Sequence, residues 1–111
     1  MPARGTIVIA SAGGGLRGKP RPAIVVQASD FDFVETLIVV PLTSRELDDN
    51  AAMPLLIPDG QNGLEEDSRA MLHRIGAIRK SDVGVEVGTL SSNDMARVDA
   101  ALSLVLGLNA A

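Results

Sequence analysis

Seven short runs of aliphatic and β-branched residues follow one another along this chain, and turn-forming residues separate each run from the next. Val and Ile dominate these runs, and both residue types favour strands over helices. We expect strands at residues 6–10, 22–27, 37–42, 53–57, 69–72, 75–78 and 83–90. Short strands at this spacing predict a barrel or a strongly curled sheet.

Two of the runs are continuously apolar rather than alternating. They are Ala23-Ile24-Val25-Val26 and Leu37-Ile38-Val39-Val40. A strand that faces water on one side shows alternation, whereas a strand covered on both faces does not. We therefore expect these two runs to be central strands that are buried on both faces.

One helix is expected, at the end of the chain. Ser91 is a good N-cap residue and Asp94 follows it three positions later, which is the pattern of a capping box. Apolar residues then recur at helical spacing, at Met95, Val98, Leu102 and Val105. Gly107 is a suitable stop, so this helix should lay one apolar stripe on the sheet.

The chain has 111 residues, which fits one domain at residues 1–111. It has no Cys and a single His, so we expect no disulfide, no thiolate nucleophile and no metal cofactor. No signal peptide and no membrane-spanning stretch is recognisable, which favours the cytoplasm. The net charge of −4 argues against general nucleic-acid binding, so any such binding must come from a local basic site.

A candidate for that local site lies between the first two expected strands. Arg17, Lys19 and Arg21 alternate at a spacing of two, which puts three cations on one side of an extended chain. They could bind phosphate, or they could be edge charges that prevent aggregation. Pro20 and Pro22 flank Arg21 and restrict its backbone.

Two further pairs carry groups that could act on a phosphate. Thr43-Ser44 follows the buried run that ends at Pro41, so both hydroxyls should emerge at the end of a central strand. They could donate to a phosphate, or they could simply begin a turn. His73-Arg74 lies between two apolar runs; His73 could carry a proton near neutral pH, or it could be a structural residue.

Several motifs, in order along the chain, resemble the MazF/PemK toxin family. The opening Arg4-Gly5-Thr6-Ile7-Val8 resembles the family's first strand, and Gly18-Lys19-Pro20-Arg21-Pro22 its Gly-x-x-Arg-Pro motif. The Pro-apolar-Thr-Ser motif is matched by Pro41-Leu42-Thr43-Ser44, and Gly88-Thr89-Leu90-Ser91 leads into the terminal helix as it does in the family. The resemblance spans roughly residues 4 to 108.

This resemblance implies an α+β fold, namely an SH3-like curled β-barrel with a C-terminal helix, and a homodimer. It also implies a metal-independent endoribonuclease toxin of a type II toxin–antitoxin system, silenced by a MazE-like antitoxin. The arginine and threonine that carry cleavage fall on Arg21 and Thr43. RNA contacts would come from Arg17, Lys19, Ser44, Arg45 and Arg74, with His73 as a further candidate for proton transfer.

The sequence departs from the family at residues 73–78. Many relatives have an acidic residue where this chain has His73, and an Arg-Thr pair where it has Gly76-Ala77. Base recognition would rely on the loops at residues 31–33 and 44–50, because the chain has only two aromatic residues. Two alternatives stay open: a non-enzymatic toxin of the CcdB kind, and an inactive relic that only binds its antitoxin.

Overall fold

The computed structural model describes residues 2–11, 19–45 and 49–108 of the chain. They form seven strands, one α-helix and three short 3-10 helices. The strands are β1 (Thr6–Ala10), β2 (Arg21–Val25), β3 (Thr36–Thr43), β4 (Leu55–Leu56), β5 (Ser68–Ala70), β6 (Gly76–Arg79) and β7 (Val83–Thr89). The helices are η1 (Ser29–Phe31), η2 (Leu72–Arg74), η3 (Lys80–Asp82) and α1 (Ser92–Leu106).

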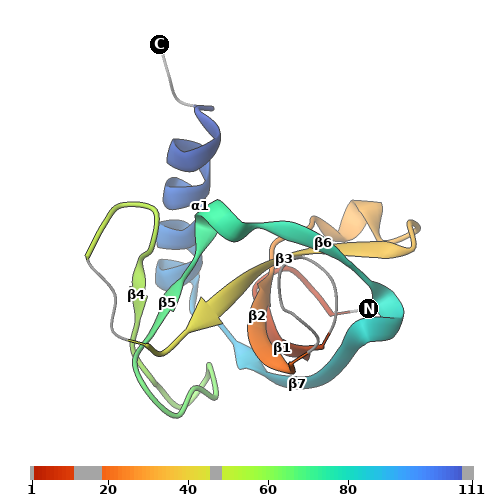
Figure 1. Cartoon of the computed structure of the whole chain (residues 1–111), viewed down its shortest axis with the longest axis horizontal. Helices are drawn as coiled ribbons and strands as arrows, with labels where there is room; N and C mark the ends of the chain where they lie inside the picture. The colour runs from red at the N-terminus through yellow and green to blue at the C-terminus, as the bar shows by residue number, and fades with distance from the viewer. Residues whose placement is uncertain (1, 12–18, 46–48, 109–111) are drawn as a thin grey trace.

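The strands form one antiparallel sheet in the order β4-β5-β3-β2-β1-β7, with β6 paired to β3 as well. β3 is its centre, because its first half pairs with β6, its middle with β2 and its last two residues with β5. β6, β3, β2, β1 and β7 curl around a common axis, and α1 stands beside the curl behind β4 and β5 (Figure 1). The expected curled sheet with a C-terminal helix is confirmed.

Each central strand contributes to two hydrophobic cores. Ile24 and Val40 belong to the core between the sheet and α1, which also contains Val98. Their neighbours Val25 and Val39 belong to the second core, on the other face of the sheet. Successive side chains of a strand point to opposite faces, so a continuous apolar run fills both cores at once. This arrangement explains the two apolar runs.

One residue of these runs is not buried. Ile38 is 39% exposed, contrary to the expectation for the second run. It lies on the part of β3 that pairs with Ala77 of β6, before the strand reaches the region covered by α1. Burial on both faces therefore begins only at Val39.

The terminal helix has the expected ends. Ser91 is the N-cap and its Oγ accepts a hydrogen bond from the backbone N–H of Asp94 at 3.1 Å. Gly107 ends the helix in the left-handed region, with φ of 71°. Val98 is fully buried in the core, and Met95, Leu102 and Val105 pack against it. Among the described residues, no helix combines the length and the hydropathy that a bilayer crossing requires.

Several strand bounds differ from the expectation. The strand expected at 53–57 shrinks to Leu55–Leu56, because Met53 N–H bonds locally to the Asn50 carbonyl and Ile57 C=O accepts from the Asn62 side chain. The strand expected at 22–27 ends at Val25. Beyond it, Val26 N–H still donates to the Ile38 carbonyl at 3.1 Å, but Ile38 N–H donates to a side chain instead of the backbone: the Oε1 of the buried Gln27 accepts it at 3.0 Å.

Candidate functional site

Arg21 and Thr43 lie at the point where β2 and β3 separate. Arg21 is the first residue of β2, and Thr43 is the last residue of β3. The final pair between the two strands is Ala23 with Pro41, so each residue lies two positions beyond it. Directly opposed residues of an antiparallel pair project from the same face, and every second residue returns to that face. Arg21 and Thr43 therefore share one face of the sheet.

The point where β2 and β3 separate, which we call the fork, is flanked by two proline residues, Pro22 on β2 and Pro41 on β3. Neither Pro22 nor Pro41 has an N–H to donate to a sheet ladder. Beyond the last pair, β2 stays with β1, where Ala10 is opposite Arg21, while β3 turns to β5. The Pro41 carbonyl accepts a hydrogen bond from the N–H of Met71 at 2.9 Å, which holds β3 against the segment that follows β5.

The Arg21 guanidinium is free to meet an anion. The residue is half-buried, and within residues 2–11, 19–45 and 49–108 nothing accepts a hydrogen bond from its side chain. The Thr43 hydroxyl oxygen accepts from the backbone N–H of Arg45 at 3.2 Å. No acceptor for the Thr43 O–H is present in the same described ranges, so this hydroxyl can donate to a ligand.

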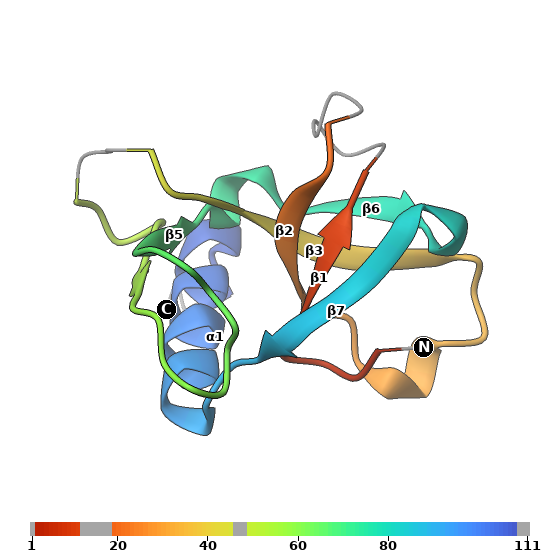
Figure 2. The same cartoon turned by 90° about the horizontal axis from the view of Figure 1, so that it is seen from below.

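Other candidate residues surround the fork. Ser44 and Arg45 follow Thr43 directly, Lys19 precedes β2 by two residues, and all three are exposed. His73 and Arg74 are exposed on η2, which starts beside Pro41 through the Met71 contact. The start of β2 and η2 lie toward the same edge of the molecule (Figure 2). Arg17 lies outside the described residues.

The structure does not bring the loop at residues 31–33 to this fork. Phe31 and Phe33 are 57% and 77% exposed, with ring centroids 6.3 Å apart. They follow the far end of β2, and η1 lies at the edge of the molecule opposite the start of that strand (Figure 2). For this loop to contact RNA bases, the RNA would have to extend from the fork around the curled sheet to the opposite edge of the molecule.

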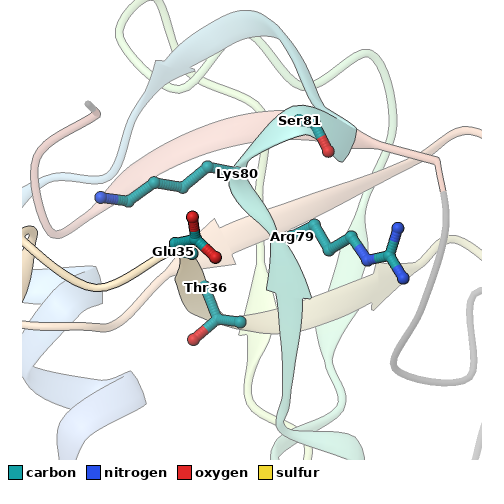
Figure 3. A pocket seen from close by; sticks show the side chains of 5 residues that line it. All are labelled: Glu35, Thr36, Arg79, Lys80 and Ser81. Carbon is teal, nitrogen blue, oxygen red and sulfur yellow. The ribbon is translucent and has the colours of Figure 1, made fainter.

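A pocket of about 470 Å³ also lies away from the fork, lined by Glu35, Thr36, Arg79, Lys80 and Ser81 (Figure 3). Thr36 and Thr43 are at opposite ends of β3, roughly 23 Å apart at the rise of an extended strand. Arg79 and Lys80 point in different directions in Figure 3, and the Lys80 ammonium donates to the Asp32 carbonyl. This pocket therefore does not focus positive charge on one ligand.

Arg69 lies opposite Thr43 on β5 and was not among the site residues that the sequence predicted. Its Nη1 donates to the Met53 carbonyl at 2.8 Å and to Asp49 Oδ1 at 3.0 Å. The sequence around Arg69 shows only an arginine between Ser68 and Ala70. Nothing in that segment indicates which strand β5 pairs with, so it does not predict that Arg69 lies beside Thr43. Within the described parts of the chain, no three side chains of His, Cys, Asp or Glu are grouped closely enough to hold a metal ion.

With this fold and fork established, the relatives of the chain define its class: small toxins of bacterial toxin–antitoxin systems. Residues 3–106 match the family model described as PemK-like, MazF-like toxin of type II toxin-antitoxin system. A probable endoribonuclease MazF of Mycolicibacterium smegmatis is 34% identical over 105 residues, which covers 95% of this chain and 96% of that protein. The chain belongs to the PemK/MazF toxin family, and the resemblance noted from its motifs is confirmed.

Solved structures share the fold at lower identity. An endoribonuclease from mycobacterial species, in complex with its cognate antitoxin, superposes with a TM-score of 0.80 at 19% identity, over 97% of each chain. Toxin MazF-mt6 of Mycobacterium tuberculosis gives 0.78 at 19% identity, over 92% of this chain and 96% of that one. MazF of Deinococcus radiodurans gives 0.77 at 20% identity, over 96% of both. These matches show that the curled sheet and terminal helix are the architecture of MazF toxins.

Proposed function

We propose that this chain is an endoribonuclease toxin that cleaves single-stranded RNA at specific sequences, as a single domain that needs no metal ion. Its membership of the toxin family and its 34% identity to a probable endoribonuclease support this function. The observation that carries the proposal is the position of Arg21 and Thr43, which share a face where β2 and β3 separate. Such a toxin would act as an mRNA interferase and arrest growth.

The proposed reaction is an internal transesterification of RNA. The 2′-hydroxyl oxygen attacks the adjacent phosphorus, and the bond to the 5′-oxygen of the next nucleotide breaks. The proton leaves the 2′-oxygen for a base, and another proton reaches the departing 5′-oxygen. The products are a 2′,3′-cyclic phosphate and a 5′-hydroxyl, and the step needs donors aimed at the charge that develops on phosphorus.

The residues at the fork supply those donors. The Arg21 guanidinium would stabilise the phosphorane charge, and the Thr43 hydroxyl would donate to a phosphate oxygen. His73 on η2 would carry a proton. The residues that would hold the RNA backbone are Arg17, Lys19, Ser44, Arg45 and Arg74. These are local cations and hydroxyls in a chain whose net charge is −4, so they would give a confined RNA site.

The experiment that tests the proposal is cleavage of a defined single-stranded RNA by the purified protein, with excess EDTA present. We expect fragments with 5′-hydroxyl and 2′,3′-cyclic phosphate ends, and mapping those ends would reveal the recognised sequence. A protein with both Arg21→Ala and Thr43→Ala, purified in the same way, controls for contaminating nucleases. Equal cleavage by this double variant would refute the proposal.

The same assay separates the two alternatives. A CcdB-like toxin would arrest growth when induced but would leave RNA intact in the purified reaction. An inactive relic would neither arrest growth nor cleave RNA. The side chains at the fork favour the nuclease, since a purely protein-binding toxin has no need for an arginine and a hydroxyl on one face.

The proposed partner is an antitoxin related to MazE. The solved structures with a similar fold include an endoribonuclease with its cognate antitoxin and MazE–MazF complexes of Deinococcus radiodurans. An acidic, disordered antitoxin segment would complement the cations of the fork and would order itself on binding. Such a segment should inhibit cleavage in competition with RNA, which an inhibition assay would reveal.

We also propose a homodimer that works in the cytoplasm, where its RNA substrate is found. Leu104, Leu106 and Leu108 are 60%, 52% and 68% exposed at the end of α1, and association would remove this apolar surface from water. Light scattering of the purified protein should give twice the chain mass of 11.5 kDa.

A further inference from the structure

The only two aromatic side chains of this chain, Phe31 and Phe33, are both exposed to solvent. They lie on residues 28–35 between β2 and β3, which we call the aromatic loop. The two ring centroids are 6.3 Å apart, and Val34 adds a further apolar side chain that is 37% exposed. Aromatic side chains contribute strongly to cores and interfaces, so a pair of them kept in water is typical of a surface that binds another molecule.

The aromatic loop is held in place by bonds from both sides. The buried Gln27 donates from its Nε2 to the Phe31 carbonyl at 3.0 Å. From η3, the Lys80 ammonium donates to the Asp32 carbonyl, and the Lys80 N–H donates to the Glu35 carbonyl at 3.0 Å. The loop therefore has little backbone freedom to lose when a ligand covers the rings, which lowers the entropic cost of binding.

The charges around the two rings are mainly negative. Asp30, Asp32 and Glu35 are exposed on the aromatic loop, and among the described residues no cation forms an ion pair with their carboxylates. Lys80 brings one positive charge to the loop, whereas the Arg79 side chain extends away from Glu35 (Figure 3). Such a surface repels the phosphates of RNA and attracts a positively charged ligand.

Aromatic rings beside carboxylates suit arginine better than lysine. A guanidinium group stacks on a ring face and still donates hydrogen bonds to a carboxylate, whereas an ammonium group is more strongly hydrated and does not stack. In an extended segment, every second side chain points the same way, and such side chains are about 6.7 Å apart. This spacing is close to the 6.3 Å between the two ring centroids, so alternate arginines of one segment can each meet one ring.

We propose that the aromatic loop is a docking site for an extended, arginine-containing segment of a partner protein. Alternate arginines of the segment stack on Phe31 and Phe33, and the neighbouring carboxylates accept hydrogen bonds from them. Thr36, which follows the loop, is roughly 23 Å along β3 from Thr43 at the fork. This partner segment is therefore distinct from the acidic antitoxin segment proposed for the fork, and the two sites can be occupied together.

Fluorescence anisotropy with a short labelled peptide of alternating Arg and Ser, in low-salt buffer, tests the proposal. We expect the double variant Phe31→Ser/Phe33→Ser to weaken peptide binding roughly tenfold, since it removes both ring faces. Val85→Ser is the control for loss of exposed apolar surface, because Val85 is 72% exposed on β7, and it should bind as the parent does. A peptide with Lys in place of Arg should bind the parent more weakly.

A second pair of variants controls for charge, because a chain with a net charge of −4 attracts a basic peptide everywhere. Three exposed carboxylates are neutralised in each variant, on the aromatic loop in Asp30→Asn/Asp32→Asn/Glu35→Gln and between β4 and β5 in Glu65→Gln/Glu66→Gln/Asp67→Asn. The first should weaken peptide binding several-fold more than the second. Equal losses would show that the peptide responds to net charge alone and would overturn the proposal, even if the Phe variant does not fold.

Other occupants of the aromatic loop give different results. If RNA binds there, Phe31→Ser/Phe33→Ser would weaken the binding of single-stranded RNA to a protein that also has Arg21→Ala. If a second copy of the chain binds there, the same two changes would lower the mass measured by light scattering. Either result, or unchanged peptide binding, overturns the proposal. These measurements do not require RNA cleavage, so the proposal fails or stands separately from the proposed nuclease activity.

Discussion

Gly88 of β7 lies directly against the backbone of Asn62. A Cβ atom on Gly88 would be 2.4 Å from the carbonyl carbon of Asn62. Asn62 is itself fully buried, and its side chain holds its own loop: Oδ1 accepts from the N–H of Asp59 and Leu64, and Nδ2 donates to the Ile57 carbonyl. The loop between β4 and β5 is therefore docked on β7 through a contact that only glycine permits.

Gly88→Ala should destabilise the fold, because the added methyl group meets backbone that cannot move aside. We expect a loss of about 1–3 kcal/mol in the free energy of unfolding. Thermal denaturation would measure it as a lower Tm, and Gly60→Ala is the control, since no atom lies within 4 Å of a Cβ at that position. Equal Tm values for the two variants would show that the loop is not docked in this way.

Arg21→Ala should slow RNA cleavage by about 10²–10³, which is the usual cost of losing one preorganised donor to a developing charge. The side chain has no partner within the described residues, so the Tm should stay close to that of the parent. Single-turnover cleavage measures the effect. Arg79→Ala, which removes an exposed arginine of β6 lining the separate pocket, should cleave at the parental rate.

Thr43→Val should reduce kcat by roughly tenfold or more, because the variant keeps the shape of the side chain but cannot donate to a phosphate oxygen. Thr36→Val is the matched control, since it makes the same change at the opposite, exposed end of β3. If both variants cleave RNA with the same kcat, the hydroxyl of Thr43 takes no part in the reaction.

His73→Gln tests the proposed proton carrier. General acid–base catalysis contributes about 10²–10⁴ to a rate, so the variant should lose at least a hundredfold in kcat if His73 moves a proton in the rate-limiting step. His73 is exposed on η2, so the exchange should leave the fold intact, and circular dichroism would check this. A kcat within twofold of the parent would assign proton transfer to another group.

Arg4 and Asp99 give a prediction about stability. Arg4 joins the start of the chain to α1 through two contacts with the Asp99 carboxylate, at 2.6 and 3.2 Å, and its Nε donates to the Val26 carbonyl at 2.8 Å. The ion pair is partly exposed and should contribute less than about 1 kcal/mol. Asp99→Asn should therefore lower the free energy of unfolding only slightly, and Arg4→Ala should lower it by about 1–3 kcal/mol because it also frees a carbonyl. Urea denaturation distinguishes them, and a larger effect of Asp99→Asn would contradict this reasoning.

The sequence predicted most elements of this fold because their signals are local. Strand β1 was expected at residues 6–10 and is found there, and the ends of α1 follow from Ser91 and Gly107. The strand ends were less predictable. The early end of β2 depends on the Gln27 side chain bonding to Ile38, eleven residues away, and residue types near β2 carry no sign of that bond.

The sequence alone determined the family, the curled sheet with its terminal helix, and Arg21 and Thr43 as candidates, since spacing and residue type are properties of short segments. Only the tertiary structure decided that Arg21 and Thr43 share a face at a fork, that Arg69 stands opposite Thr43, and that the loop of Phe31 lies elsewhere. These relationships follow from which strands pair and in what register. The strands adopt the pairing and register that bury the side chains of both hydrophobic cores at once. The pairing therefore depends on several segments together and cannot be predicted from any one of them.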